Sequence, residues 1–203
     1  MGIAEANKYI KDLRKRQADP FLWPDYLTGL PEKPAIIRVL EEAYPKLGEY
    51  SVVFVRIANI QPYLLKYGPD NHANIIQWAA AVLKTSARKC RNSFVGTLNT
   101  HDFVVVCRTK NMQKFFCEAN ELFRKKAETF YSQSDVRKGT VLYFNQDDGQ
   151  AIRIGLMKLI GVVADSKLKI KRQDLIRCMS NVCDLLEGTE EDFVVMNNRM
   201  ICG

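Results

Sequence analysis

Residues 51–58 form an almost unbroken run of β-branched and aromatic side chains, SVVFVRIA. Such residues favour the extended backbone of a strand, and a run without polar alternation indicates a strand buried on both faces. A strand of this kind needs neighbouring strands at its edges and helices above and below it. The run therefore predicts the centre of a layered structure.

The rest of the chain alternates between helical and extended patterns. Apolar residues at helical spacing predict helices at 1–19, 34–47, 62–67, 71–89, 112–130 and 171–186. Apolar runs bounded by turn residues predict strands at 94–98, 102–108, 140–144, 151–163 and 193–196, with turns at Asn99-Thr100 and at 145–149. This order predicts an α+β fold, in which helices cover a mostly antiparallel sheet.

The N-terminal helix stands apart in the sequence. Asp19-Pro20 and Trp23-Pro24 end it, because the residue before a proline avoids the helical region. We therefore expect an N-terminal helix or linker at 1–24 and a single domain at 25–203. The helix carries an apolar stripe that it cannot bury alone, so it packs on its own domain or on a partner helix.

Composition narrows the class of protein. The chain has 203 residues, 47% of them hydrophobic, and a formal net charge of +7. The apolar content excludes a disordered chain, and no uncharged apolar run approaches the ~20 residues that span a bilayer. The six cysteines lack CxxC spacing, and no secretory pattern opens the chain, so we expect reduced core thiols in a cytoplasmic protein. The charge suggests nucleic acid, but no recognised motif supports that partner.

One short segment resembles a known family. Asp25-Tyr26-Leu27-Thr28-Gly29-Leu30-Pro31 is similar to the Asp-x-Leu-Thr-Gly-Leu-Pro opening of GGDEF domains, the diguanylate cyclase family. Tyr67-Gly68, the hairpin at 94–107 and Gly161 follow in the family's order. The resemblance covers roughly residues 25–200. It implies a cyclase-like α+β fold with a mostly antiparallel sheet of about five strands.

Active members of this family join two GTP molecules into cyclic di-GMP, using carboxylates that hold Mg²⁺. The resemblance places their Gly-Gly-Asp-Glu-Phe signature at Asn99-Thr100-His101-Asp102-Phe103, where only the phenylalanine is unchanged. It places the metal-binding aspartate of the first strand at Arg56. A guanidinium cannot ligate Mg²⁺ and repels it.

Other functional positions of the family are also replaced. The Asn-Asp pair that reads guanine falls at Leu64 and Leu65, and the lysine of the late helix falls near Glu187. The remaining replacements are Pro69 and Ala73 after the guanine pair, and Cys90 and Ser93 at the product-binding Arg-x-x-Asp site. The resemblance therefore implies a degenerate domain, with its fold kept and its cyclase chemistry lost.

Arg56 allows two interpretations. It forms an ion pair with Asp102 where the metal would lie, or Arg56 and Asp102 together contribute to binding an anion or nucleotide. His101 and His72 are lone histidines, a pattern that seldom marks a metal site.

The motif loop is expected to be structural, because Asp and Thr side chains bond backbone groups in turns and glycine permits a tight path. Its residues are Asp25, Leu27, Thr28, Gly29, Leu30 and Pro31.

The sequence predicts a catalytically inactive GGDEF-like module that regulates or binds other signalling domains in cyclic di-GMP-type signalling, with no metal and no cofactor. A non-catalytic sensor of GTP or cyclic di-GMP is the alternative, and a divergent active cyclase using Asp102 and His101 ranks below it. A homodimer is an open option for the partner, and an insertion at 137–152 has no assigned role.

Overall fold

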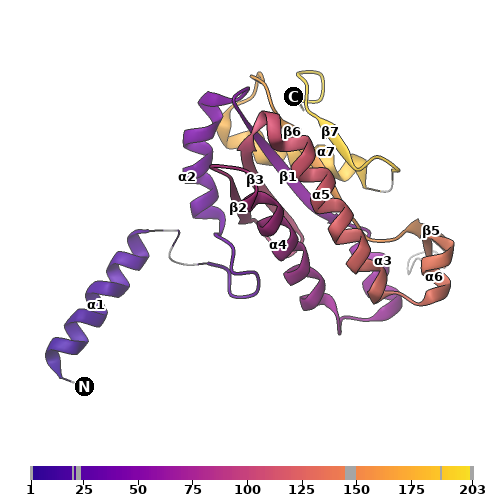
Figure 1. The fold of residues 1–203 in the computed structure, drawn as a ribbon, viewed down its shortest axis with the longest axis horizontal. Helices are drawn as coiled ribbons and strands as arrows, with labels where there is room; N and C mark the ends of the chain where they lie inside the picture. Colours follow the sequence, from indigo (N-terminus) through magenta and orange to yellow (C-terminus); the bar gives the residue numbers. More distant parts are fainter. Residues whose placement is uncertain (1, 20, 22–23, 145–149, 188, 202–203) are drawn as a thin grey trace.

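The chain folds around a five-stranded sheet (Figure 1). The structure is a computed structural model that describes residues 2–19, 21, 24–144, 150–187 and 189–201. Across the sheet, the strands are ordered β2 (Phe94–Thr97), β3 (Asp102–Arg108), β1 (Tyr50–Ala58), β6 (Lys158–Ala164) and β7 (Phe193–Val195). Only the β6–β7 pair is parallel. The predicted α+β class and the mostly antiparallel sheet are confirmed.

The run at 51–58 is the middle strand, as predicted. Val55 lies opposite Phe103 on one side and Gly161 on the other, and Arg56 lies opposite Asp102. A Cβ atom at Gly161 would lie 2.5 Å from the Phe116 ring. Glycine therefore lets that aromatic ring pack directly on the sheet backbone.

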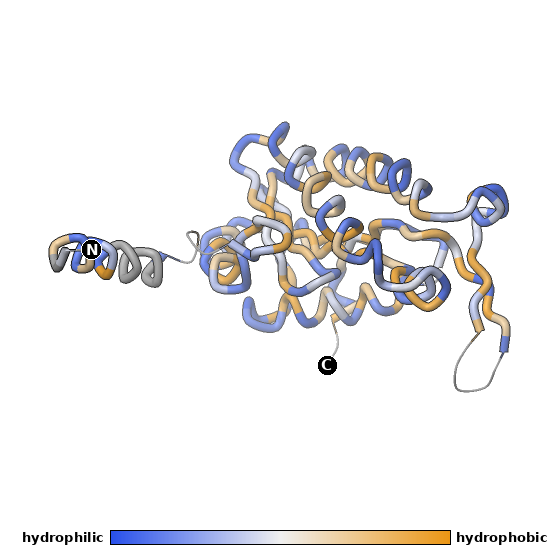
Figure 2. The backbone as a smooth tube through the Cα atoms, turned by 90° about the horizontal axis from the view of Figure 1, so that it is seen from below, coloured by the Kyte–Doolittle hydropathy of each residue, from blue (hydrophilic) through white to orange (hydrophobic). Residues whose placement is uncertain are grey.

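Helices cover both faces of the sheet. One face packs against α3 (Ile60–Tyr67), α4 (His72–Arg88) and α5 (Thr109–Ala127). The other packs against α2 (Lys33–Ala43) and α7 (Arg172–Leu186). Figure 2 shows mostly hydrophobic residues along the inner strands, whereas hydrophobic and hydrophilic residues alternate along the helices. Alternate residues of β1 enter the two cores, because successive side chains of a strand point to opposite faces.

The predicted strand at 151–163 is wrong as a single element. It divides into β5 (Ala151–Gly155) and β6, and β5 pairs with β4 (Thr140–Phe144) in a separate two-stranded sheet. The whole of β6 is buried, whereas the residues of β5 alternate between exposed and half-buried. The two halves therefore belong to different surroundings despite their similar composition. The predicted turn at 145–149 lies outside the described residues.

A short helix before β4, α6 (Gln133–Lys138), was not predicted. The Ser132 hydroxyl caps it by accepting a hydrogen bond from the Asp135 backbone N–H. Ser-x-x-Asp spacing is the signal that would have located this helix. Single-turn helices also extend α2 at Tyr44–Lys46 and α5 at Glu128–Phe130.

The N-terminal helix, α1 (Ile3–Ala18), projects away from the sheet and its covering helices (Figure 1). Its Tyr9 and Ile10 side chains are 59% and 46% exposed. The apolar stripe on the described part of α1 is therefore uncovered. Within the described residues, no helix is both long and apolar enough to cross a membrane.

The five cysteines that the structure describes are free thiols. Four are buried in the cores, as expected, and Cys117 on α5 is exposed. The sixth, Cys202, lies outside the described residues.

Candidate functional site

The β2–β3 turn is organised by one side chain. The Asn99 Oδ1 atom accepts hydrogen bonds from the backbone N–H groups of His101 and Asp102, both at 2.9 Å. The Asn99 Nδ2 atom donates to the Asp102 carboxylate at 2.8 Å. An asparagine that bonds its own turn in this way stabilises the turn through side-chain to backbone hydrogen bonds. Within the turn, Thr100 is exposed, and Phe103 beyond it is fully buried.

Arg56 contacts Asp102 across the sheet, as the ion-pair interpretation predicts. The Arg56 Nε atom lies 2.7 Å from Asp102 Oδ1, and its Nη2 atom lies 3.3 Å from Oδ2. Asp102 is 7% exposed, so the carboxylate is shielded from water. This two-pronged geometry is the strong form of an arginine–carboxylate contact.

Ser180 and Asp184 of α7, and Glu187 directly after it, join this cluster, a role that was not predicted for any of the three. The Arg56 guanidinium also bonds Asp184, donates to Ser180 Oγ at 3.1 Å and lies 3.8 Å from Glu187 Oε2. Spacing was the available signal, because Ser180, Asp184 and Glu187 recur every three to four residues and share one face of a helix. These residues with Arg56 and Asp102 are called the Arg56 cluster below.

The electrostatics of the Arg56 cluster favour the guanidinium and disfavour a metal ion. Burial opposes its charged form, but hydrogen bonds to Asp102 and Asp184 raise the pKa of Arg56 above its ordinary value. The fixed cation lies among the carboxylates of Asp102, Asp184 and Glu187. Among the described residues, no three His, Cys, Asp or Glu side chains are placed to share a metal ion. The residues present do not fit the Mg²⁺ that the fold family implies.

The positions that would read guanine offer apolar side chains. Leu64 packs against the core, and Leu65 is 52% exposed. Where the resemblance places the product-binding site, Cys90 is buried and the Ser93 hydroxyl donates to the Ala87 carbonyl at 2.6 Å.

The motif loop is held by its own residues. The Asp25 carboxylate accepts from the Thr28 N–H and hydroxyl, both at 2.7 Å. The Thr28 hydroxyl in turn accepts from the Leu30 N–H at 3.2 Å. Gly29 has φ of 63°, in the left-handed region that favours glycine. These bonds bear out the structural interpretation of Asp25, Thr28 and Gly29. Of the other motif residues, Leu30 is buried in the core, Leu27 packs against it, and Pro31 accepts from the Thr97 N–H.

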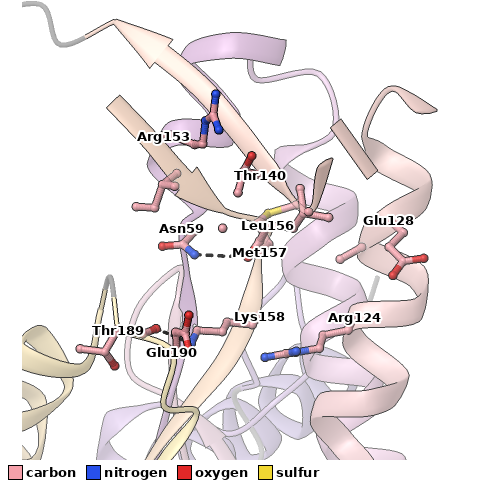
Figure 3. Close-up of a pocket in the computed structure, with 14 residues that line it drawn as sticks. Asn59, Arg124, Glu128, Thr140, Arg153, Leu156, Met157, Lys158, Thr189 and Glu190 are labelled. Atoms are coloured by element: carbon pink, nitrogen blue, oxygen red, sulfur yellow. Dashed lines mark hydrogen bonds between the residues drawn. The ribbon is translucent and has the colours of Figure 1, made fainter. Parts of the chain in front are cut away.

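A cavity of about 590 Å³ lies between the β4–β5 sheet, α5 and the start of β6 (Figure 3). Asn59, Arg124, Arg153 and Lys158 are among the residues that line it. Asp192 forms ion pairs with both Arg124 and Lys158, at 2.7 and 3.0 Å. None of the residues of the Arg56 cluster lines the cavity.

Asn59 connects the cavity to the Arg56 cluster. Its backbone N–H donates to Glu187 Oε1 at 3.2 Å, and its Nδ2 atom donates to the Leu156 carbonyl at 3.2 Å. Asn59 follows β1 directly in the left-handed region, with φ of 62°. Asparagine tolerates this conformation better than most residues.

The two histidines of the chain meet, although they are 29 residues apart. His72 begins α4, and His101 lies in the β2–β3 turn. Their Nε2 atoms are 2.8 Å apart, and both rings are half-buried. Burial and the nearby His72 lower the pKa of His101 below its usual value, despite the opposing effect of Asp102. The expectation that these were unrelated lone histidines is wrong.

This chain resembles known proteins in three-dimensional structure but not in overall sequence. No protein-family model matches the sequence, and no curated protein matches it. Many solved structures of GGDEF domains match the fold with high probability. The sheet order, the covering helices and the hairpin turn described above are therefore those of a GGDEF-like domain.

Three of these structures illustrate the similarity. The diguanylate cyclase SiaD of Pseudomonas aeruginosa, in complex with its activator SiaC, has a TM-score of 0.61 at 12% identity, over 95% of this chain and 68% of SiaD. The coiled coil and GGDEF domain of DgcB from Caulobacter crescentus gives a TM-score of 0.61 at 12% identity. The match covers 96% of this chain and 97% of the DgcB chain. Vibrio cholerae LapD, in an S helix–GGDEF–EAL form, gives a TM-score of 0.62 at 12% identity. The match covers 100% of this chain and 43% of the LapD chain.

Proposed function

We propose that this GGDEF-like domain has lost cyclase chemistry and regulates other signalling domains through binding, in cyclic di-GMP-type signalling. The observation that carries the proposal is the Arg56 guanidinium, held by Asp102 and Asp184 where an active cyclase would hold its metal. A metal ion at that point would have to displace an internal cation and break its hydrogen bonds. Leucines at the guanine-reading positions support the same conclusion.

Turnover of GTP is the direct test. The full chain, incubated with GTP and either Mg²⁺ or Mn²⁺, is expected to form no cyclic di-GMP. Arg56→Asp restores one carboxylate but no guanine contact, so this variant should also be inactive. Formation of cyclic di-GMP by the unaltered chain would overturn the proposal.

The binding role is assigned to α1, with residues 1–24 as a connecting helix and 25–203 as the domain. The exposed Tyr9 and Ile10 side chains support contact with another helix. Among the similar structures, DgcB carries a coiled coil and LapD an S helix. A second copy of α1 is the simplest partner that matches this apolar stripe.

The mass of the chain in solution tests this assignment. Light scattering is expected to give a dimer, and Tyr9→Lys with Ile10→Lys is expected to give a monomer of unchanged helical content. Lys8→Glu with Lys11→Glu is the matched control, which alters charge and spares the two apolar side chains. A monomeric unaltered chain would exclude self-association and leave a different signalling domain as the partner.

A non-catalytic nucleotide sensor is the second candidate, and the 590 Å³ cavity favours it. A cavity of this size accommodates a drug-sized ligand, and Arg153 has no ion-pair partner among the described residues. Arg56 contributes less to this candidate, because its donors are already bound within the Arg56 cluster.

Calorimetry with GTP, GDP and cyclic di-GMP distinguishes the two candidates. Saturable binding that Arg153→Gln weakens would favour the sensor, with Arg177→Gln on the exposed surface of α7 as the control. Flat titrations with all three nucleotides would end the sensor hypothesis and leave the binding module.

A further inference from the structure

We propose that His72 and His101 form a binding site for one divalent transition-metal ion such as Zn²⁺, Ni²⁺ or Cu²⁺. The two Nε2 atoms point at one another across 2.8 Å, from two different structural elements. In the metal-free pair, one Nε2 atom must donate a proton and the other must accept it. When a metal ion binds, the donor ring carries its proton on Nδ1 instead, and the Nε2 lone pairs of both neutral rings bind the ion.

The distance is close to that of a coordinated pair. Zinc–imidazole bonds of about 2.0–2.1 Å at a tetrahedral angle place two ligand nitrogens roughly 3.3 Å apart. The rings would therefore need to separate by roughly 0.5 Å, which small side-chain rotations supply. The ring planes already meet at 52°, so neither ring blocks the other.

The backbone on both sides holds the two imidazoles in place. The His101 N–H donates to Asn99, and its carbonyl accepts from the Ile57 N–H of the central strand at 3.0 Å. His72 is anchored by its N–H to the Pro69 carbonyl at 2.9 Å. Little conformational freedom remains to be lost when a metal ion binds, which favours binding.

The charges nearest the two imidazoles balance one another. Asp102 attracts a cation at this position and Arg56 repels it, and the two are paired with each other. Because these two effects oppose each other, the affinity for a metal ion depends mainly on the two imidazole ligands.

The donor set selects the kind of metal. Imidazole nitrogen suits zinc, copper and nickel, whereas Mg²⁺ prefers oxygen ligands. Among the described residues, no third His, Cys, Asp or Glu joins the pair, so water would complete the coordination. This site is separate from the Arg56 cluster, and it does not depend on whether the domain is catalytic.

Zinc calorimetry on the full, untagged chain tests the site, in a Cys117→Ser background that removes the exposed thiol. One saturable ion per chain is expected, and His72→Gln and His101→Gln should each weaken binding at least about tenfold. Asp70→Asn is the matched control and should stay within about twofold, because it removes a nearby charge but no imidazole. Absence of saturable binding, or binding indifferent to both histidine variants, would overturn the proposal.

A second measurement needs no histidine variant and remains informative if one fails to fold. The chain has two histidines, so its proton NMR spectrum has two imidazole Hε1 signals. Substoichiometric Cu²⁺ should broaden both signals together, before the signals of other residues. Selective broadening of one signal, or of neither, would contradict a shared site. Neither experiment measures GTP turnover. A negative result in either would therefore overturn the metal site without affecting the proposed function.

Discussion

The motif loop and the Arg56 cluster are both polar networks of the same domain, but their hydrogen bonds connect different parts of the chain. In the motif loop, Asp25, Thr28 and Leu30 bond within six residues of sequence. In the Arg56 cluster, Arg56 bonds Asp102 and Asp184, which lie 46 and 128 residues away. The loop network shapes a turn, whereas the cluster joins β1, β3 and α7.

This difference bears on how each region tolerates change. A local network depends only on the few residues of its own turn, so changes elsewhere in the chain do not remove its hydrogen-bond partners. In a network that spans three elements, the loss of one charged side chain leaves its buried partners on other elements unpaired.

The largest expected effect is on the cluster. Arg56→Met leaves the buried Asp102 carboxylate without its cation, and we expect the free energy of unfolding to fall by about 3–5 kcal/mol. Urea denaturation measures this loss. Adding Asp102→Asn removes the stranded charge and should recover at least about 1 kcal/mol. A single variant that loses less than about 1 kcal/mol would contradict the account of the cluster.

A smaller effect is expected in the loop. Asp25→Ala removes the acceptor for two hydrogen bonds from Thr28, which should lower the free energy of unfolding by about 1–2 kcal/mol. Thermal and urea denaturation measure the change. Tyr26→Ala is the neighbouring control, since Tyr26 is 96% exposed and should change stability by less than about 0.5 kcal/mol. Equal effects of the two variants would argue against a structural role for Asp25.

The backbone of the loop gives a third prediction. Gly29→Ala places a Cβ atom on a residue with φ of 63° and should cost about 1 kcal/mol, although nothing lies within 4 Å of that atom. Urea denaturation should also show a smaller cost for Gly29→Asn, because asparagine accepts this region more readily. An alanine variant as stable as the unaltered chain would show that the backbone at position 29 does not require glycine.

The smallest effect should come from the exposed edge of the cluster. Asp184→Asn weakens a contact whose carboxylate is 60% exposed, so the expected loss of stability is about 0.2–1 kcal/mol. Raising the salt concentration should shrink this loss further, since exposed charges are screened. A loss as large as that of Arg56→Met would mean that Asp184, and not Asp102, anchors the guanidinium.

The fold was predictable where the pattern was long and buried. The unbroken apolar run at 51–58 indicates a buried strand, and the longer helices repeat their apolar residues at helical spacing over many residues. The region from 133 to 157 was predicted less well, because α6 spans less than two turns and β5 lies on a small separate sheet. Burial distinguishes β5 from β6, and burial is a property of the whole fold.

The candidate site was also predictable only in part, because some of its contacts depend on how distant elements pack. The Arg56–Asp102 contact followed from pairing two strands that the resemblance had already placed. The contribution of Asp184 depends on how α7 is rotated against the sheet, which no local pattern in the sequence specifies. The contact between His72 and His101 similarly depends on where the first turn of α4 meets the β2–β3 turn.

The central position of β1 also has a consequence during synthesis. Its two neighbours in the sheet are β3 and β6, and β6 follows it by roughly a hundred residues. At translation speeds of 5–20 residues per second, one edge of this apolar strand waits roughly 5–20 s for its partner. Closure of the sheet then depends on long-range pairing, the slow step for β-rich domains. The nascent chain therefore keeps one edge of β1 unpaired, and open to aggregation, until β6 emerges.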